Sequence, residues 1–191
     1  MKQFLLLASL QMLIVACNDK RTPTKEQSNE FAIAIHTSTC CGIKADQQNF
    51  VNKFVVAIKQ FHDDKNADID IKELKNLLHK AQQANRMSLD ALNELQEIDE
   101  EINLKKYALA QVNSDKSLFE MMGGVIDAIE KKDYEKVTEM ITSFSQMEEE
   151  IKGIRKVAQD ADTKFSEKYR ILPFIDDSPK KNKPAPNSWF T

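Results

Sequence analysis

Glycine, proline and basic clusters are scarce in this chain, and each shortage narrows its possible functions. Its 191 residues include four glycines and five prolines. So few glycines leave few tight turns on which strained catalytic residues are mounted, and neither a Gly-x-Ser-x-Gly motif nor a glycine-rich phosphate loop is present. The net charge is −3, and the densest basic cluster is Lys180, Lys181 and Lys183, so nothing indicates nucleic-acid binding. Charged residues are abundant, at 30% against 7% aromatics, which is typical of an all-helical domain.

The N-terminal segment carries the most informative motif. Lys2 precedes the mostly apolar run 4–16, and Cys17 follows that run directly. The run is shorter than the ~20 residues that a membrane-spanning helix needs. The polar and charged residues 18–21 prevent it from extending further. A charged tip, a short apolar core and a small residue before a cysteine are typical of a secretory signal peptide with a lipid-attachment site.

The four residues Ile14-Val15-Ala16-Cys17 resemble the lipobox that ends the type II signal peptide of bacterial lipoproteins. The resemblance implies that the chain is cut before Cys17, that acyl chains such as palmitate are attached to its thiol, and that the new amino group is usually acylated too. At ~0.8 kcal/mol per buried CH₂, two or three acyl chains hold a protein durably at a membrane. The alternative is an ordinary signal peptide cut near Ala16, with Cys17 a plain thiol.

The same resemblance implies a location in the bacterial cell envelope. We expect attachment to the outer membrane, facing the periplasm, in preference to the inner membrane. The residues after the cysteine influence this sorting in the lipoprotein family, but Asn18-Asp19 does not decide it without knowledge of the host.

Composition divides the chain into four predicted parts. The signal peptide covers 1–16, and a lipidated flexible tether covers 17–45 because its polar residues bury too little to become ordered. As a coil, such a tether spans about 30 Å. A helical domain covers 46–172, and a disordered tail rich in proline and lysine covers 173–191. The apolar residues 31–35 interrupt the tether and are expected to dock on the domain or to form a short extended piece.

Apolar residues at helical spacing predict the first helices of the domain. One helix is expected from Asp46 to about Phe61, and the next begins after Asp68 or Asp70. Polar residues fall on the apolar stripe of the second helix near 86–88. We therefore expect a kink or break there, with Ser88 as the N-cap of a new helix.

The remaining pattern predicts a boundary at 113–117, followed by two more helices. Gly123-Gly124 lies inside the first of these, which indicates close approach of a neighbouring helix. The last helix is expected from Asp133 to Arg170, about 55 Å long, and the short link before it forces a hairpin. The predicted fold is an all-α antiparallel bundle of four or five helices with a long C-terminal helix. Tandem helical repeats are a second interpretation, but no period near ~34 residues is found.

The segment between the first two predicted helices resembles an EF-hand calcium loop in its alternating oxygen ligands. Ile69 stands where the turn glycine belongs, and Lys75 stands where the closing glutamate belongs. The alternative is a helix–helix link whose aspartates cap the next helix. The candidate calcium ligands are Asp64, Asn66, Asp68 and Asp70.

Cys40 and Cys41 are adjacent, and three interpretations stay open for them. They form a strained disulfide with each other, pair with another molecule, or remain free thiols. His36 lies four residues before Cys40 and raises a metal-site hypothesis. A structural zinc site needs four ligands with paired spacing, and no second cluster follows. The alternative is a polar loop with incidental thiols.

Acidic runs at 97–101 and 148–150 raise the question of acid–base chemistry. No Glu-x-x-His pair accompanies them, so solvent-exposed helix faces paired with Lys105 and Lys152 are the expected interpretation. Four methionines either line an adaptable groove or fill the core, and core filling is favoured. These are Met121, Met122, Met140 and Met147.

The sequence therefore predicts a membrane-anchored envelope lipoprotein that acts by binding or as a structural module, without catalysis and without a cofactor. Its expected partners are the membrane, through Cys17, and an envelope protein. The alternative is a ligand- or calcium-binding envelope protein that uses the 64–70 loop or a pocket between helices.

Overall fold

The computed structural model describes residues 22–40 and 43–171 of the chain. Their secondary structure is entirely helical, with coil or turns at 22–24, 64–70, 95–103, 131–133 and 170–171. None of the helices within the described ranges is long and apolar enough to cross a bilayer. The helices are α2 (Lys25–Cys40), α3 (Ile43–Asp63), α4 (Ile71–Glu94), α5 (Leu104–Glu130) and α6 (Tyr134–Tyr169).

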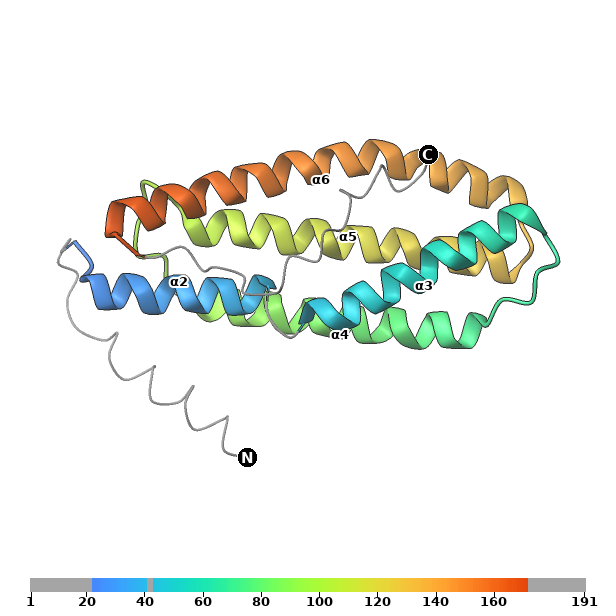
Figure 1. Cartoon of the computed structure of the whole chain (residues 1–191), viewed down its shortest axis with the longest axis horizontal. Coiled ribbons are helices and arrows are strands. Elements are labelled where there is room, and N and C mark those ends of the chain that lie inside the picture. Colours follow the sequence, from blue (N-terminus) through green and yellow to red (C-terminus); the bar gives the residue numbers. More distant parts are fainter. Residues whose placement is uncertain (1–21, 41–42, 172–191) are drawn as a thin grey trace, which may run out of the picture.

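The helices form an elongated bundle with alternating directions (Figure 1). Helices α2 and α3 follow one another along the bundle, while α4, α5 and α6 each pass through both halves of it and reverse direction at every link. The short link 131–133 joins α5 and α6 in a hairpin. These features confirm the predicted all-α antiparallel bundle with a long C-terminal helix.

Two hydrophobic clusters occupy the two halves of the bundle. The first, the α3 core, joins α3 to the early part of α4, the end of α5 and the start of α6. The second, the α2 core, joins α2 to the end of α4, the start of α5 and the end of α6. Because α4, α5 and α6 contribute to both clusters, the two halves share three continuous elements. Fully buried aromatic rings anchor the clusters: Phe50, Phe54 and Phe61 in the α3 core and Phe165 in the α2 core.

Gly123 and Gly124 lie where α5 meets its two neighbours, as expected. A Cβ atom on Gly123 would lie 3.2 Å from Cδ2 of Leu78 in α4. A Cβ atom on Gly124 would lie 2.6 Å from the terminal methyl of Met140 in α6. The glycine pair therefore allows α5 to pack closely against both helices, which offsets its low helix propensity.

The predicted flexible tether needs a correction, because residues 25–40 form helix α2 and pack on the bundle. A reciprocal capping box starts the helix: the Gln27 N–H donates to Oγ1 of Thr24 at 3.2 Å, and the Thr24 N–H donates to Oε1 of Gln27 at 2.9 Å. Phe31, Ala32 and Ile35 share one helical face and are buried. Burial of that face supplies the stabilisation that a composition argument does not detect.

The predicted break at 86–88 is wrong, because α4 continues through it. Asn85 donates from Nδ2 to the Val112 carbonyl at 2.9 Å, and Ser88 donates from Oγ to the Ser38 carbonyl at 2.6 Å. Both polar side chains are buried and serve as ties to neighbouring helices. Ser88 therefore does not cap a new helix.

The predicted boundary at 113–117 is also wrong, since α5 is continuous there. The side chains of Asn113, Ser114 and Ser117 donate to carbonyls of the preceding turn at 2.9, 2.7 and 3.3 Å. Val112 and Phe119, two turns apart, are both buried on the same side. Packing on both sides of the polar cluster therefore keeps the helix intact despite its weak propensity.

Two predicted helix starts are confirmed. Asp70 accepts the N–H of Glu73 at 2.8 Å, and Asp133 accepts the N–H of Lys136 at 3.0 Å. The predicted signal peptide, the lipidation site Cys17 and the predicted tail 173–191 lie outside the described residues.

Candidate functional site

A cavity of about 350 Å³ lies at the middle of the bundle between α3, α5 and α6. It lies beside the point where α2 ends and α3 begins, because Thr39 and Gln47 both border it. We call it the waist cavity. Its apolar floor consists of Val51, Phe54, Phe119, Met122, Phe144 and Ile151.

Aromatic rings set the shape of the floor. The Phe54 and Phe144 ring centroids are 6.1 Å apart at an interplanar angle of 58°. Phe50, behind the floor, lies 5.7 Å from Phe54 and 5.9 Å from Phe119. All four phenylalanines are buried, and tilted packing of this kind suits further aromatic rings.

Charged side chains at the rim are paired with each other. Arg155 donates to Oδ1 of Asp115 at 2.9 Å, which links α6 to α5. Lys152 contacts Glu149 at 2.9 Å and Glu148 at 3.0 Å, and these hydrogen bonds raise the pKa of Lys152. The rim therefore presents ion pairs of balanced charge.

Uncharged amides complete the rim. Gln47 and Gln48 come from α3, and Gln111 comes from α5. Each amide can both donate and accept hydrogen bonds. An apolar floor with a few polar groups at its mouth is the usual form of a binding site for an apolar or aromatic group.

The sequence-predicted methionine set is mostly core. Met122 is buried and lines the waist cavity, while Met121 and Met140 pack against the α3 core. Met147 is half-buried on α6. Core filling was the favoured interpretation, and three of the four residues follow it.

Side-chain oxygens of the candidate calcium loop accept hydrogen bonds from protein groups. Asp64 accepts the N–H of Asn66 at 2.8 Å, and Asp70 caps α4. Asn66 Oδ1 accepts from Nζ of Lys132 at 3.3 Å. In the described ranges, no group of three or more histidine, cysteine or acidic side chains is placed to hold a metal ion. The contacts of Asp64, Asn66 and Asp70 favour the interpretation of this segment as a helix–helix link, in which Asp70 caps α4.

The cysteine pair falls at the junction between α2 and α3. Cys40 is the last residue of α2, and Cys41 lies outside the described residues, so their chemical state stays a prediction. His36 Nε2 lies 3.6 Å from Oδ2 of Asp162 on α6. The structure therefore gives His36 an acidic neighbour on another helix.

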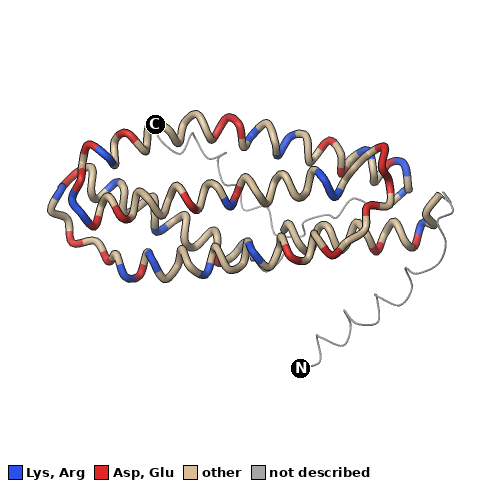
Figure 2. Tube along the Cα trace, turned by 180° about the vertical axis from the view of Figure 1, so that it is seen from behind, with Lys and Arg blue, Asp and Glu red and all other residues tan. Residues whose placement is uncertain are grey.

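The acidic run 97–101 does not form the expected exposed helix face, because it lies in the loop between α4 and α5. Glu97 accepts the N–H groups of Ile98 and Asp99 at 3.1 and 3.2 Å, and that of Lys105 at 2.9 Å. It therefore ties the loop to the first turn of α5. Along the rest of the bundle, acidic and basic residues are interspersed (Figure 2).

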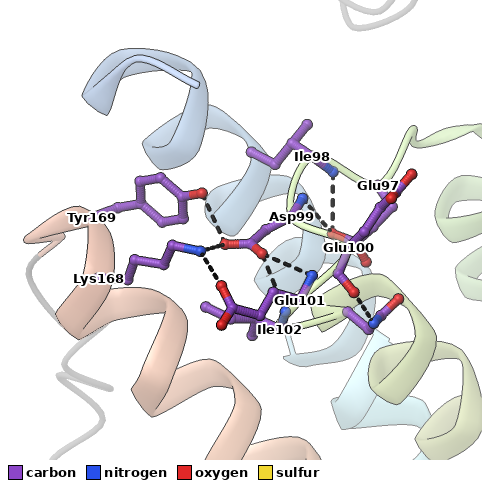
Figure 3. A network of polar contacts seen from close by, with 9 residues as sticks. Glu97, Ile98, Asp99, Glu100, Glu101, Ile102, Lys168 and Tyr169 are labelled. Atoms are coloured by element: carbon purple, nitrogen blue, oxygen red, sulfur yellow. Dashed lines mark hydrogen bonds and ion pairs between the residues drawn. The ribbon is translucent and has the colours of Figure 1, made fainter. Parts of the chain in front are cut away.

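Asp99 is the centre of a polar cluster at this end of the bundle (Figure 3). Its side chain is 3% exposed and receives Nζ of Lys168 at 2.7 Å and the hydroxyl of Tyr169 at 2.8 Å, both from α6. The N–H groups of Glu101 and Ile102 donate to its other oxygen, each at 3.1 Å. We call this cluster the Asp99 clasp, because it fastens the α4–α5 loop to the end of α6.

The clasp shifts the pKa values of its members. Burial acts to raise the pKa of Asp99, but the hydrogen bonds from Lys168, Tyr169 and the Ile102 N–H outweigh it and hold that pKa below its usual value. Burial, together with the hydrogen bond to Asp99, raises the pKa of Tyr169 to about 12. The pKa of Lys168 is raised by its bonds to Asp99 and Glu101. Each group is thus held in the protonation state that the clasp needs.

The helical periodicity of the sequence did not predict the Asp99 clasp. Its α6 members, Lys168 and Tyr169, are 69 and 70 positions away from Asp99 in the chain. The signal available in the sequence was the dense acidic run itself, which helical periodicity did not explain. Comparisons with models of known protein families, with curated proteins and with solved structures find no match to this chain.

Proposed function

We propose that this chain is a bacterial envelope lipoprotein, anchored through acyl chains on Cys17, whose helical bundle binds another envelope component. The observation that carries the proposal is the lipobox order Ile14-Val15-Ala16-Cys17, placed shortly before a folded domain. The favoured location is the outer membrane, with the bundle in the periplasm.

The position of α2 indicates which end of the bundle would lie near the membrane. Residues 18–24 alone separate Cys17 from the first residue of α2. An extended segment of this length spans at most about 25 Å. An anchored protein therefore keeps the start of α2 close to the bilayer, together with the α4–α5 loop and the end of α6, which lie at the same end of the bundle (Figure 1).

Binding is proposed in place of catalysis because of the character of the waist cavity. Its floor is apolar and its charged rim residues pair with each other, through Arg155–Asp115 and Lys152–Glu148. Such a site gains free energy from burying an apolar group and orients it through a few polar contacts. The expected partner is a protein of the envelope.

The anchoring proposal is tested by growing the native bacterium with an alkyne-tagged fatty acid and capturing the protein. We expect the label on the wild-type chain and mass spectrometry to show an acylated Cys17 at the new N-terminus. Cys17→Ala should carry no label and leave the membrane fraction, whereas Cys40→Ala, the matched control, should keep both. An unmodified Cys17 or an uncleaved leader would overturn the proposal.

The binding proposal is tested separately by native electrophoresis of gently solubilised membranes. We expect the protein to migrate in a complex with one stoichiometric second protein. Migration as a lone chain in detergent, at native expression level, would contradict the binding role and leave the anchoring result standing.

A further inference from the structure

We propose that the waist cavity is the docking site of the chain's own C-terminal segment, with Trp189 and Phe190 as its occupants. This segment lies outside the described residues. The proposal uses the cavity and the sequence of the segment, and it does not depend on lipidation of Cys17.

The segment is long enough to reach the cavity. The described chain ends at Ile171, and the α6 residues of the rim extend to Arg155. The two positions are sixteen steps apart in the chain, almost all within α6, which is about 24 Å along the helix axis. A polyproline-like segment from residue 172 to Trp189 extends up to about 50 Å. The segment can therefore turn back along α6 and arrive at the cavity with length to spare.

The composition of the segment favours an extended arm with an aromatic tip. Residues 173–187 contain four of the five prolines of the chain together with polar and charged residues. Proline favours extended backbone and gives such an arm a low ordering cost. Trp189, the only tryptophan of the chain, and Phe190 follow this arm. They are the only adjacent aromatic residues of the segment, whose other large apolar residues, Leu172, Phe174 and Ile175, lie at its start.

The cavity matches two aromatic side chains in size and chemistry. A cavity of about 150 Å³ holds a benzene ring, and the waist cavity measures about 350 Å³. Its floor includes three phenylalanines, Phe54, Phe119 and Phe144. The rim amides of Gln48 and Gln111 can accept the indole N–H and pair with the backbone of an extended arm.

Docking of this kind would make the segment a built-in competitor for the cavity. Any partner that inserts an apolar group there must first displace Trp189. Because the occupant is tethered, its effective concentration is high and only a strongly binding partner succeeds.

Fluorescence of Trp189 tests the proposal directly, since no other tryptophan contributes. The full chain is studied as the cell makes it, in phosphatidylcholine vesicles if it is anchored and in buffer if it is not. We expect blue-shifted emission and weak quenching by acrylamide. Val55→Lys, which places a charge in the cavity, should shift the emission to the red and increase quenching several-fold.

Val56→Lys is the matched control. Val56 is the next residue of α3, is 54% exposed and does not line the cavity, whereas Val55 does. We expect the wild-type emission and quenching in this variant. Urea unfolding of both variants checks that the bundle stays folded.

Several outcomes would overturn the proposal. Wild-type Trp189 that is quenched as strongly as free tryptophan would show that the cavity does not hold it. A blue shift that Val55→Lys leaves unchanged would place Trp189 elsewhere: in the bilayer if brominated lipids quench it, or in a second copy of the chain if dilution abolishes the shift.

Discussion

Asp99 carries a carboxylate in a buried position. A buried carboxylate is costly unless it is paired and hydrogen-bonded. Asp99 meets that condition with two partners from α6 and two backbone N–H groups from its own loop. Loss of the charge would therefore leave Lys168, Tyr169 and the loop with weaker contacts at once.

We expect Asp99→Asn to lower the free energy of unfolding by about 2 kcal/mol, because hydrogen bonds to a charged group contribute more than neutral ones. Urea denaturation measures the change. Glu101→Gln is the control, since Glu101 also contacts Lys168, at 3.1 Å, but its side chain is 84% exposed. Glu101→Gln should change the free energy of unfolding by less than about 0.5 kcal/mol. Equal losses in Asp99→Asn and Glu101→Gln would contradict the idea that burial strengthens the contacts of Asp99.

The clasp also predicts a loss of stability at alkaline pH. The pKa of Tyr169 is raised to about 12 in the folded state, against about 10 when unfolded. The contribution of Tyr169 to the free energy of unfolding is therefore complete below about pH 10 and is lost as the pH rises toward 12. The urea midpoint should fall over this window in the wild type and fall less in Tyr169→Phe. Tyr134→Phe, at the other end of the bundle, should behave as the wild type.

The lowered pKa of Asp99 has the opposite effect and predicts a loss of stability at low pH. The pKa of Asp99 is lowered in the folded state, so its contribution is complete above the unfolded value near 3.9 and is lost as the pH falls below it. Acid unfolding of Asp99→Asn should lack this part of the pH dependence. A steeper acid dependence in that variant than in the wild type would contradict the assignment.

Helix α2 depends on α4 for the end of its hydrogen-bond ladder. The carbonyl of Ser38 lies in the last turn of α2, where helical carbonyls lack internal partners. Ser88 of α4 supplies the missing donor at 2.6 Å in a buried position. The hydroxyl thus fastens α2 to the bundle at the point where the chain passes into α3.

We expect Ser88→Ala to leave that carbonyl unsatisfied, at a cost of about 1–3 kcal/mol. The effect should be local, so amide hydrogen exchange in residues 28–39 should accelerate more than exchange in α5. Ser143→Ala is the control, since its exposed hydroxyl bonds to the Glu139 carbonyl of its own helix. Uniform acceleration throughout the bundle would show that α2 does not open separately.

The whole bundle should unfold cooperatively although it contains two cores. Phe50 in the α3 core and Phe165 in the α2 core are both fully buried. Truncation of either to alanine should cost about 3–5 kcal/mol and shift one transition, because α4, α5 and α6 pass through both halves. Urea unfolding followed by circular dichroism tests this. A second transition in either variant would show that the halves are independent.

Local patterns in the sequence were sufficient to predict the helical class, a helix start after Asp68 or Asp70 and another at Asp133, and the close packing at Gly123-Gly124. Each depends on contacts within a few residues or on the period of one helix. The same local view produced the wrong breaks at 86–88 and 113–117, where it treated polar residues as helix ends.

The other features of the structure depend on tertiary packing and could not be predicted from local sequence patterns. It folded residues 25–40 into α2, connected Asp99 to Lys168 and Tyr169, and formed the waist cavity from three helices. The physical reason is common to all three. A polar or weakly apolar residue takes its role from the groups that face it, and here those groups come from distant parts of the chain.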